Sequence, residues 1–335
     1  RSSDLGQVLC HDITQIIKGV TKDAVFRKGH IITEEDISVL LSVGKDHIYI
    51  WENNENMLHE NDAAKILYDM CANEHMTPSE IKEGKIELIA ECDGLLKVDT
   101  ERLNAVNALG EMMIACRHGN FPVKKGDKIA GTRIIPLVIE KEKMERAKKA
   151  AGEEPIFELI PFKKMKAAIV NTGNEVFYGR IKDTFTPVII EKLKEYGAEV
   201  VGHVVSDDNH EHITAAIQKF LDEGVDMVLC TGGMSVDPDD RTPLAIKNTG
   251  AEIVTYGAPV LPGAMFLLSY YGEKKRPVIG LPGCVMYAKR TIFDLVLPRI
   301  VAGEILKKAD IDTLGEGGLC LNCPVCTFPN CGFGK

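Results

Sequence analysis

Short apolar runs typical of buried strands alternate with helical segments between residues 163 and 305. Each helical segment ends close to a glycine or begins at a Thr-Pro step, which marks its boundaries. Repeated strand–helix–strand units predict an α/β domain with a doubly wound, mostly parallel sheet. The runs cover residues 167–170, 200–205, 225–230, 253–256 and 277–279, and the helical segments cover residues 184–196, 212–221, 242 onward and 286–300.

The chain before residue 163 has a more mixed pattern. Residues 1–52 contain a helix start with Thr33 as N-cap, followed by apolar residues at helical spacing. Residues 53–139 predict a smaller α+β or β-rich domain, with helices at 62–70, from 77–80 and at 103–113 between short strands. Residues 140–162 begin with alternating acids and bases, which predicts a charged, solvated helical linker.

Composition fits a soluble globular chain. At about 150 residues per domain, 335 residues suggest about two domains, and 45% are hydrophobic. The 40 basic and 49 acidic residues give a net charge of −9, which argues against nucleic-acid or anionic-membrane partners. No run approaches ~18 apolar residues and the first twelve residues show no signal pattern, so we expect a cytoplasmic protein.

Four of the ten cysteines lie in the last sixteen residues, in the pattern C-x₂-C-x₂-C-x₄-C. Disulfides are rare in a reducing compartment, so we expect these four to bind a metal. Soft thiolates suit either Zn²⁺ or a [4Fe–4S] cluster, and the spacing leaves both open. The glycines at 315, 317 and 318 predict a flexible tether for this tail, residues 306–335. The four ligands would be Cys320, Cys323, Cys326 and Cys331.

Three Gly-rich turns follow predicted strands, at residues 171–175, 231–240 and 280–283. Ligands of open α/β sheets bind beyond the carboxyl ends of the strands, where turn amides can hold a phosphate. The second turn carries Asp237, Asp239 and Asp240. Their spacing fits a solvated turn that caps a helix, or a Mg²⁺ site, and leaves both open.

These motifs resemble the molybdopterin-binding domain shared by the MoeA and gephyrin E-domain molybdotransferases and the MogA-type adenylyltransferases. Residues 171–176 (NTGNEV) resemble the family's TGDEL turn, and residues 179–184 its G-x-I-x-D-S/T segment. Residues 231–240 (TGGMSVDPDD) are similar to its GGVSVGxxD loop, and residues 280–283 (GLPG) to its GLPGNP motif. Pro262-Gly263 matches the core of K-P-G-K, and residues 26–50 also resemble the MoeA type.

The resemblance implies a role in molybdenum cofactor biosynthesis. A homodimeric transferase would bind molybdopterin or its adenylylated form, insert molybdate with the help of Mg²⁺, and release AMP. Asp240 and Asp237 would be catalytic, and Asp240 would also bind the metal. The implied cofactor-binding residues are Asn171, Thr172, Gly173, Glu175, Asp183, Thr231, Gly232, Gly233, Ser235, Pro262, Gly263, Pro282 and Gly283.

The chain departs from the family at two of these motifs, and the loss of the flanking lysines supports an alternative function. Leu261 and Ala264 replace the lysines that flank Pro-Gly, and Cys284-Val285 replaces Asn-Pro after GLPG. Because the lysine side is thought to help hold molybdate, the alternative is a non-catalytic molybdopterin carrier or sensor that delivers cofactor to a molybdoenzyme. A pyridine-nucleotide hydrolase of the competence-damage type shares this domain, but the MoeA-like residues 26–50 argue against it.

Overall fold

A computed structural model describes residues 5–9, 12–17, 21–27, 29–48, 55–235 and 241–335. The chain divides into two compact units. The first unit comprises residues 1–89, 99–117 and 128–157, and the second comprises residues 90–98, 118–127 and 158–335.

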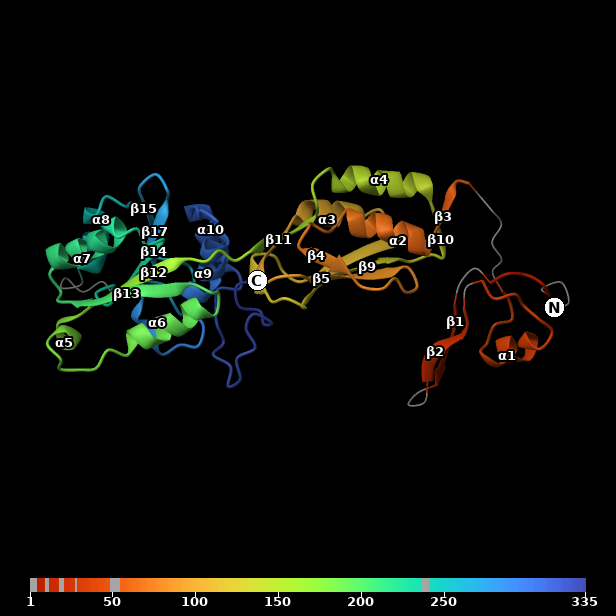
Figure 1. The fold of residues 1–335 in the computed structure, drawn as a ribbon, viewed down its shortest axis with the longest axis horizontal. Helices are drawn as coiled ribbons and strands as arrows, with labels where there is room; N and C mark the ends of the chain where they lie inside the picture. The colour runs from red at the N-terminus through yellow and green to blue at the C-terminus, as the bar shows by residue number, and fades with distance from the viewer. Residues whose placement is uncertain (1–4, 10–11, 18–20, 28, 49–54, 236–240) are drawn as a thin grey trace. The chain divides into compact units, whose positions relative to one another are not determined.

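The second unit is built on a six-stranded sheet in the order β13-β12-β14-β17-β16-β15 (Figure 1). The first four strands in this order are mutually parallel, while β16 is antiparallel to both of its neighbours. This arrangement confirms the predicted mostly parallel α/β sheet. The strands are β12 (Lys166–Thr172), β13 (Glu199–Ser206), β14 (Met227–Thr231), β15 (Glu252–Tyr256), β16 (Leu267–Tyr271) and β17 (Arg276–Leu281).

Helices cover both faces of this sheet (Figure 1). The helices α6 (Phe185–Lys194) and α9 (Ile292–Ala302) pack on the face that carries Ala167 and Ile169. The helices α7 (His210–Asp222) and α8 (Thr242–Asn248) pack on the face that carries Ala168 and Val170. Because both faces of β12, β14 and β17 are buried, these strands contain continuous apolar runs, whereas the edge strand β13 is partly exposed.

The last helix of the sheet begins later than predicted. Residues 283–286 form the 3₁₀ helix η2 (Gly283–Met286), and α9 begins only at Ile292. Thr291 and Asp294 form a reciprocal capping box that fixes this start. The other elements of the unit are α5 (Asn174–Phe177), α10 (Lys308–Asp312), η3 (Thr313–Gly315) and a second sheet of β6 (Gly94–Val98), β8 (Phe121–Val123) and β11 (Phe157–Pro161).

The first unit mixes short helices and strands, as expected for a smaller α+β region. Its four-stranded sheet has the order β4-β5-β9-β7, and Leu9, Ile13, Phe26, Ile32 and Leu40 form a separate small core. Its elements are β1 (Ile13–Ile17), β2 (Thr21–Phe26), α1 (Asp36–Ser42), β3 (Met57–His59), α2 (Glu60–Asp69), β4 (Met76–Pro78), β5 (Lys85–Ala90), α3 (Thr100–Asn107), β7 (Met112–Cys116), β9 (Lys128–Ile134), β10 (Val138–Glu140) and α4 (Lys141–Ala151).

The helix predicted to begin at residues 77–80 is wrong, because this segment is strand β4 and the turn after it. The Ser79 amide donates to the Glu87 carbonyl (2.9 Å), and the Ser79 hydroxyl accepts from the Glu87 amide (2.9 Å). Pairing with β5 therefore takes the groups that would have capped a helix.

The charged segment after residue 140 is not a solvated linker. Helix α4 buries Met144, Ala147 and Ala151, and it packs against α2 and α3 within the first unit. Its acids and bases lie on the remaining face, so their alternation describes only the solvent side of a packed helix.

Within the described part of the chain, no helix combines the length and the apolar character needed to cross a bilayer.

Candidate functional site

The carboxyl ends of the central strands meet at one edge of the large sheet. The ladder pairs Asn171 with Thr231 and Thr231 with Leu281, and it pairs Thr172 with Ser206 on the other side. The three Gly-rich turns therefore leave the sheet from neighbouring positions. This is the edge at which open α/β sheets bind their ligands.

Buried hydroxyl and amide groups connect the first two turns. The Thr231 hydroxyl donates to Asn171 Oδ1 (2.9 Å), and the hydroxyls of Thr172 and Thr242 lie 3.1 Å apart. Thr242 also donates to the Gly232 carbonyl oxygen (2.8 Å). The sequence marked Thr242 only as a helix start, and its position before Pro243 carried no sign of this bridge.

The side-chain nitrogen of Asn171 is buried and makes no hydrogen bond of ordinary geometry to the residues that the structure describes. It interacts weakly with the Asp183 carboxylate, and this interaction contributes to the lowered pKa of Asp183. Such a donor at the carboxyl edge of the sheet is suited to an acceptor atom of a bound ligand. The predicted cofactor-binding residue Asn171 thus lies at the carboxyl edge of the sheet, and its contact with a cofactor stays a prediction.

Asp183 lies at the start of α6, where its carboxylate accepts from the Phe185 amide (2.9 Å) and the Thr186 hydroxyl (2.6 Å). Burial opposes ionisation of Asp183, but the hydrogen bonds from Thr186, with a weaker contribution from Asn171, lower its pKa below the ordinary value. The His203 ring nitrogen Nε2 lies 3.3 Å from the same carboxylate. Asp183 is therefore an anionic helix cap, and its role toward a cofactor stays a prediction.

Gly173 and Glu175 shape the turn that follows β12. The Gly173 amide donates to the Ser206 carbonyl (3.2 Å), and the Glu175 carbonyl accepts from the Arg180 amide (2.8 Å). The Glu175 side chain is exposed and can accept from a ligand. Asp208 accepts from the Asn174 amide (2.9 Å) at the start of α5.

The backbone of the second turn lies directly against the end of β12. A Cβ atom on Gly232 would lie 2.0 Å from the Thr172 carbonyl oxygen, and one on Gly233 would lie 2.9 Å from the Thr242 hydroxyl. Both glycines also have positive φ, at +81° and +55°. The two glycines therefore let the second turn pack directly against the end of β12 and the start of α8.

Gly232→Ala is expected to destabilise the second unit by about 2–4 kcal/mol, because it combines backbone strain with a clash against the Thr172 carbonyl. Gly224→Ala is the matched control, since Gly224 has nearly the same φ of +84° but nothing within 4 Å of its added Cβ. Urea unfolding measures both variants. Equal losses for the two variants would show that the close approach at Gly232 has no energetic weight.

The acidic part of the second turn cannot be compared with its prediction. Asp237, Asp239 and Asp240 lie outside the described residues, so the catalytic and Mg²⁺ assignments stay predictions. Ser235, the last described residue before them, is exposed, and its carbonyl accepts from the Tyr256 hydroxyl (3.4 Å).

The two Pro-Gly motifs, at residues 262–263 and 282–283, have different surroundings. The Pro262 carbonyl accepts from the Ile292 amide (3.1 Å), and a Cβ on Gly263 would lie 2.3 Å from Ile292 Cγ2, so this motif packs on the first turn of α9. Pro282 is buried and precedes η2, while Gly283 is exposed. The GLPG turn thus leaves the same sheet edge as the first two turns, and its glycine faces solvent.

The four tail cysteines line one cavity of about 220 Å³, together with Lys289 and Arg290. Over the described ranges, no three acidic, histidine or cysteine side chains are grouped closely enough to hold a metal ion. The structure therefore brings the four thiols to one cavity without showing a formed metal centre. Nine cysteines are described and carry no disulfide, and burial raises the pKa of Cys71 to about 12.

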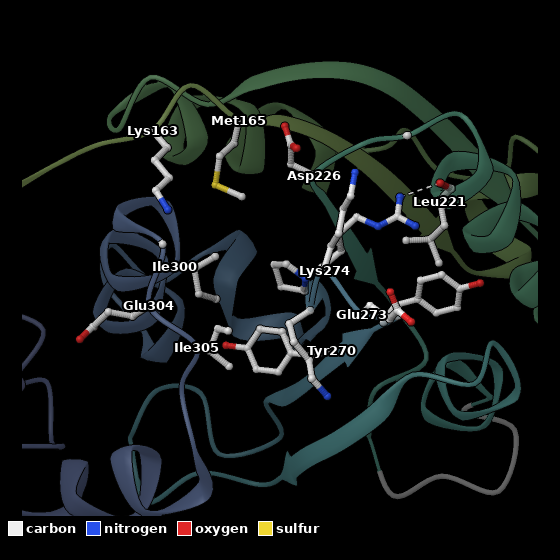
Figure 2. A pocket seen from close by; sticks show the side chains of 17 residues that line it. Lys163, Met165, Leu221, Asp226, Tyr270, Glu273, Lys274, Ile300, Glu304 and Ile305 are labelled. Atoms are coloured by element: carbon white, nitrogen blue, oxygen red, sulfur yellow. Dashed lines mark hydrogen bonds between the residues drawn. The ribbon is translucent and has the colours of Figure 1, made fainter.

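A different cavity, of about 820 Å³, opens near the amino ends of the strands, where β12 and β17 begin. Figure 2 shows Lys163, Glu273 and Lys274 around it. Because ligands of parallel sheets bind at the carboxyl ends, this cavity is separate from the site that the three turns form.

Comparison with known families agrees with the motifs. Residues 168–302 match a family described as a probable molybdopterin binding domain, and residues 5–52 match one described only as a domain of unknown function. The second unit therefore carries a domain of the molybdopterin-binding type. The resemblance of the chain to the MoeA-like family is confirmed through this domain. The MoeA-like character of residues 1–52 stays a prediction.

Individual relatives share only parts of the chain. A molybdopterin molybdenumtransferase of Synechococcus elongatus is 28% identical over 163 residues, which cover 46% of this chain and 38% of the relative. A CinA-like protein of Mycobacterium avium is 34% identical over 90 residues, which cover 27% of this chain and 21% of the relative. The chain thus spans two-fifths or less of these relatives' lengths.

Among solved structures, a molybdopterin biosynthesis MoeA protein from Pyrococcus horikosii is 18% identical. It covers 73% of this chain and 79% of its own, with a TM-score of 0.35.

Proposed function

We propose that this protein acts in molybdenum cofactor biosynthesis by binding molybdopterin, or its adenylylated form, at the edge formed by residues 171–175, 231–235 and 280–283. The observation that carries this proposal is that three Gly-rich turns leave neighbouring strands at one edge of the sheet, where the Asn171 side chain is buried and only weakly bonded to Asp183. The match to the molybdopterin-binding family over residues 168–302 supports the choice of ligand.

The residues at this edge fit the chemistry of a pterin phosphate. Carbonyl and ring-nitrogen atoms of a pterin are acceptors for Asn171 Nδ2, and its N–H groups are donors for the exposed Glu175 carboxylate. The amides of residues 231–235 suit a phosphate group. Arg180, Lys182 and Arg241 are exposed cations that would partly replace the lysines absent from positions 261 and 264.

Molybdate insertion is the proposed reaction, with molybdate as substrate and AMP as leaving group. Mg²⁺ would be held by Asp240, with Asp237 three residues before it in the sequence, and would neutralise phosphate charge. In either case, whether the protein inserts molybdate or only carries the cofactor, it would deliver the cofactor to a molybdoenzyme in the cytoplasm.

The carrier function is the second candidate, and one contact favours it. The backbone of Leu261, which stands where the family has a lysine, is bonded to the C-terminal tail through the Gly318 carbonyl and the Cys320 amide, both at 2.8 Å. A tail on this segment supports cofactor handling other than lysine-assisted molybdate binding.

Denaturing the purified protein and analysing the released compounds tests the ligand, with pterin fluorescence and AMP as readouts. Incubation with adenylylated molybdopterin, Mg²⁺ and molybdate then separates the two functions. AMP release supports the transferase, and tight binding without release supports the carrier. Absence of both binding and release would overturn the proposal.

A homodimer is part of the same proposal, by resemblance to the MoeA-like family. Light scattering of the full chain is expected to give twice the single-chain mass of 36.8 kDa. A mass near 36.8 kDa at micromolar concentration would contradict it.

A further inference from the structure

The C-terminal tail is packed on the second unit and is not a flexible tether. The Gly334 amide donates to the Gly317 carbonyl (2.9 Å), and Phe333 is only 5% exposed. Added Cβ atoms would lie 2.2 Å from the Lys335 carbonyl oxygen at Gly317 and 2.5 Å from Leu295 Cδ2 at Gly334. These glycines therefore serve close packing, and the prediction of a tether is wrong.

The cysteine segment is fixed to the rest of the second unit at three places. At its start, the Cys320 amide donates to the Leu261 carbonyl (2.8 Å). In its middle, the Lys289 ammonium donates to the carbonyls of Cys323 (3.2 Å) and Pro324 (2.7 Å). At its end, the Phe328 ring lies 6.0 Å from Phe121 and 6.3 Å from Phe333.

The fixed segment borders an open cavity that all four cysteines line, and Cys323 and Cys326 are exposed. Its volume is about 220 Å³, whereas a water-sized sphere needs only about 10–15 Å³ on this measure. A single ion would fill a small part of this space. A compact group of several atoms, such as the iron and sulfide core of a cluster, uses much more of it.

The residues that line this cavity suit an anionic cluster. Leu319, Phe328 and Phe333 supply apolar surface, and Cys320 and Cys331 are half-buried against the core. Four thiolates repel one another unless metal charge balances them. The Lys289 ammonium is held by neutral carbonyl oxygens, so it adds an uncompensated positive charge at the rim. Arg290 shares its charge with Glu195 and Asp294 and contributes less.

We propose that Cys320, Cys323, Cys326 and Cys331 ligate a [4Fe–4S] cluster, and not a single zinc ion. This assignment follows from the tail alone and does not depend on molybdopterin binding. Through the Cys320–Leu261 hydrogen bond, the cluster would lie next to the Pro262-Gly263 motif. The structure thus gives this chain a candidate redox centre that the family motif does not contain.

Anaerobic purification of the full chain, followed by reconstitution with ferrous iron and sulfide in the presence of competing zinc, tests the proposal. We expect about four iron and four sulfide per chain, with visible absorbance that dithionite bleaches. One zinc per chain without sulfide, or metal-free protein whose tail thiols all react freely, would overturn it.

Cys326→Ser is expected to lose at least half of the bound iron, while Cys116→Ser, which also removes an exposed thiol, should retain it. Full iron retention by Cys326→Ser would exclude Cys326 as a ligand and contradict the four-cysteine site. If Cys326→Ser does not fold, the metal and sulfide content of the unmodified chain still tests whether a [4Fe–4S] cluster is bound. Iron content is measured without any pterin, so this proposal and the proposed function fail independently.

Discussion

Asp294→Ala is expected to lower the free energy of unfolding by about 3–5 kcal/mol, the cost typical of breaking a buried ion pair. The Lys192 ammonium lies 2.6 Å and 2.9 Å from the two carboxylate oxygens of Asp294. The side chains are 8% and 2% exposed, so neither charge can turn to water instead. The same carboxylate accepts from the Thr291 amide (2.7 Å) at the start of α9.

Urea unfolding measures this loss. Asp312→Ala is the matched control, because its partner Lys308 is 2.6 Å away in an exposed pair worth about 0–1 kcal/mol. Adding Lys192→Met to Asp294→Ala should recover part of the stability, since it removes the uncompensated buried charge. A loss below about 1 kcal/mol for Asp294→Ala would show that water reaches Lys192.

Elements that depend on local pattern were predictable from the sequence. Strands β12, β14 and β17 are buried on both faces and therefore form continuous apolar runs. Strand β16 was not predicted, because Ser269, Tyr270 and Tyr271 interrupt its apolar pattern. The Ser269 hydroxyl is satisfied by the Val278 carbonyl (2.6 Å) of the neighbouring strand, a partner that local sequence cannot identify.

The position of the candidate site could be predicted from the sequence, but the hydrogen bonds and ion pairs around it could not. Glycine-rich turns after successive strands identified the edge of the sheet, because close backbone approach requires glycine there. The bond between Thr172 and Thr242 joins residues 70 positions apart, and the Lys192–Asp294 pair joins residues 102 apart. Such contacts arise only when helices pack on the sheet. The packed tail likewise depends on contacts with Leu261 and Leu295 that no spacing of cysteines encodes.

Asp240→Asn is expected to reduce Mg²⁺-dependent AMP release from adenylylated molybdopterin by at least about a hundredfold, if the chain is a transferase. A pyrophosphate carries several negative charges, and an unassisted carboxylate beside it would be repelled. A divalent ion that bridges the two reverses the sign of that interaction. Asparagine keeps the shape of the side chain but loses the charge that holds the ion.

The same substitution separates catalysis from folding and from ligand binding. Because asparagine caps a helix about as well as aspartate, Asp240→Asn should unfold at nearly the same urea concentration as the unmodified protein. Molybdopterin binding should persist or tighten, since one repelling charge is removed. Asp222→Asn, an exposed carboxylate on α7, is the control for charge loss alone. Undiminished AMP release would exclude Asp240 from the reaction, and a large loss of stability would make it a structural residue. Retained binding in a protein that never releases AMP, with or without the substitution, would instead assign the site to cofactor carriage.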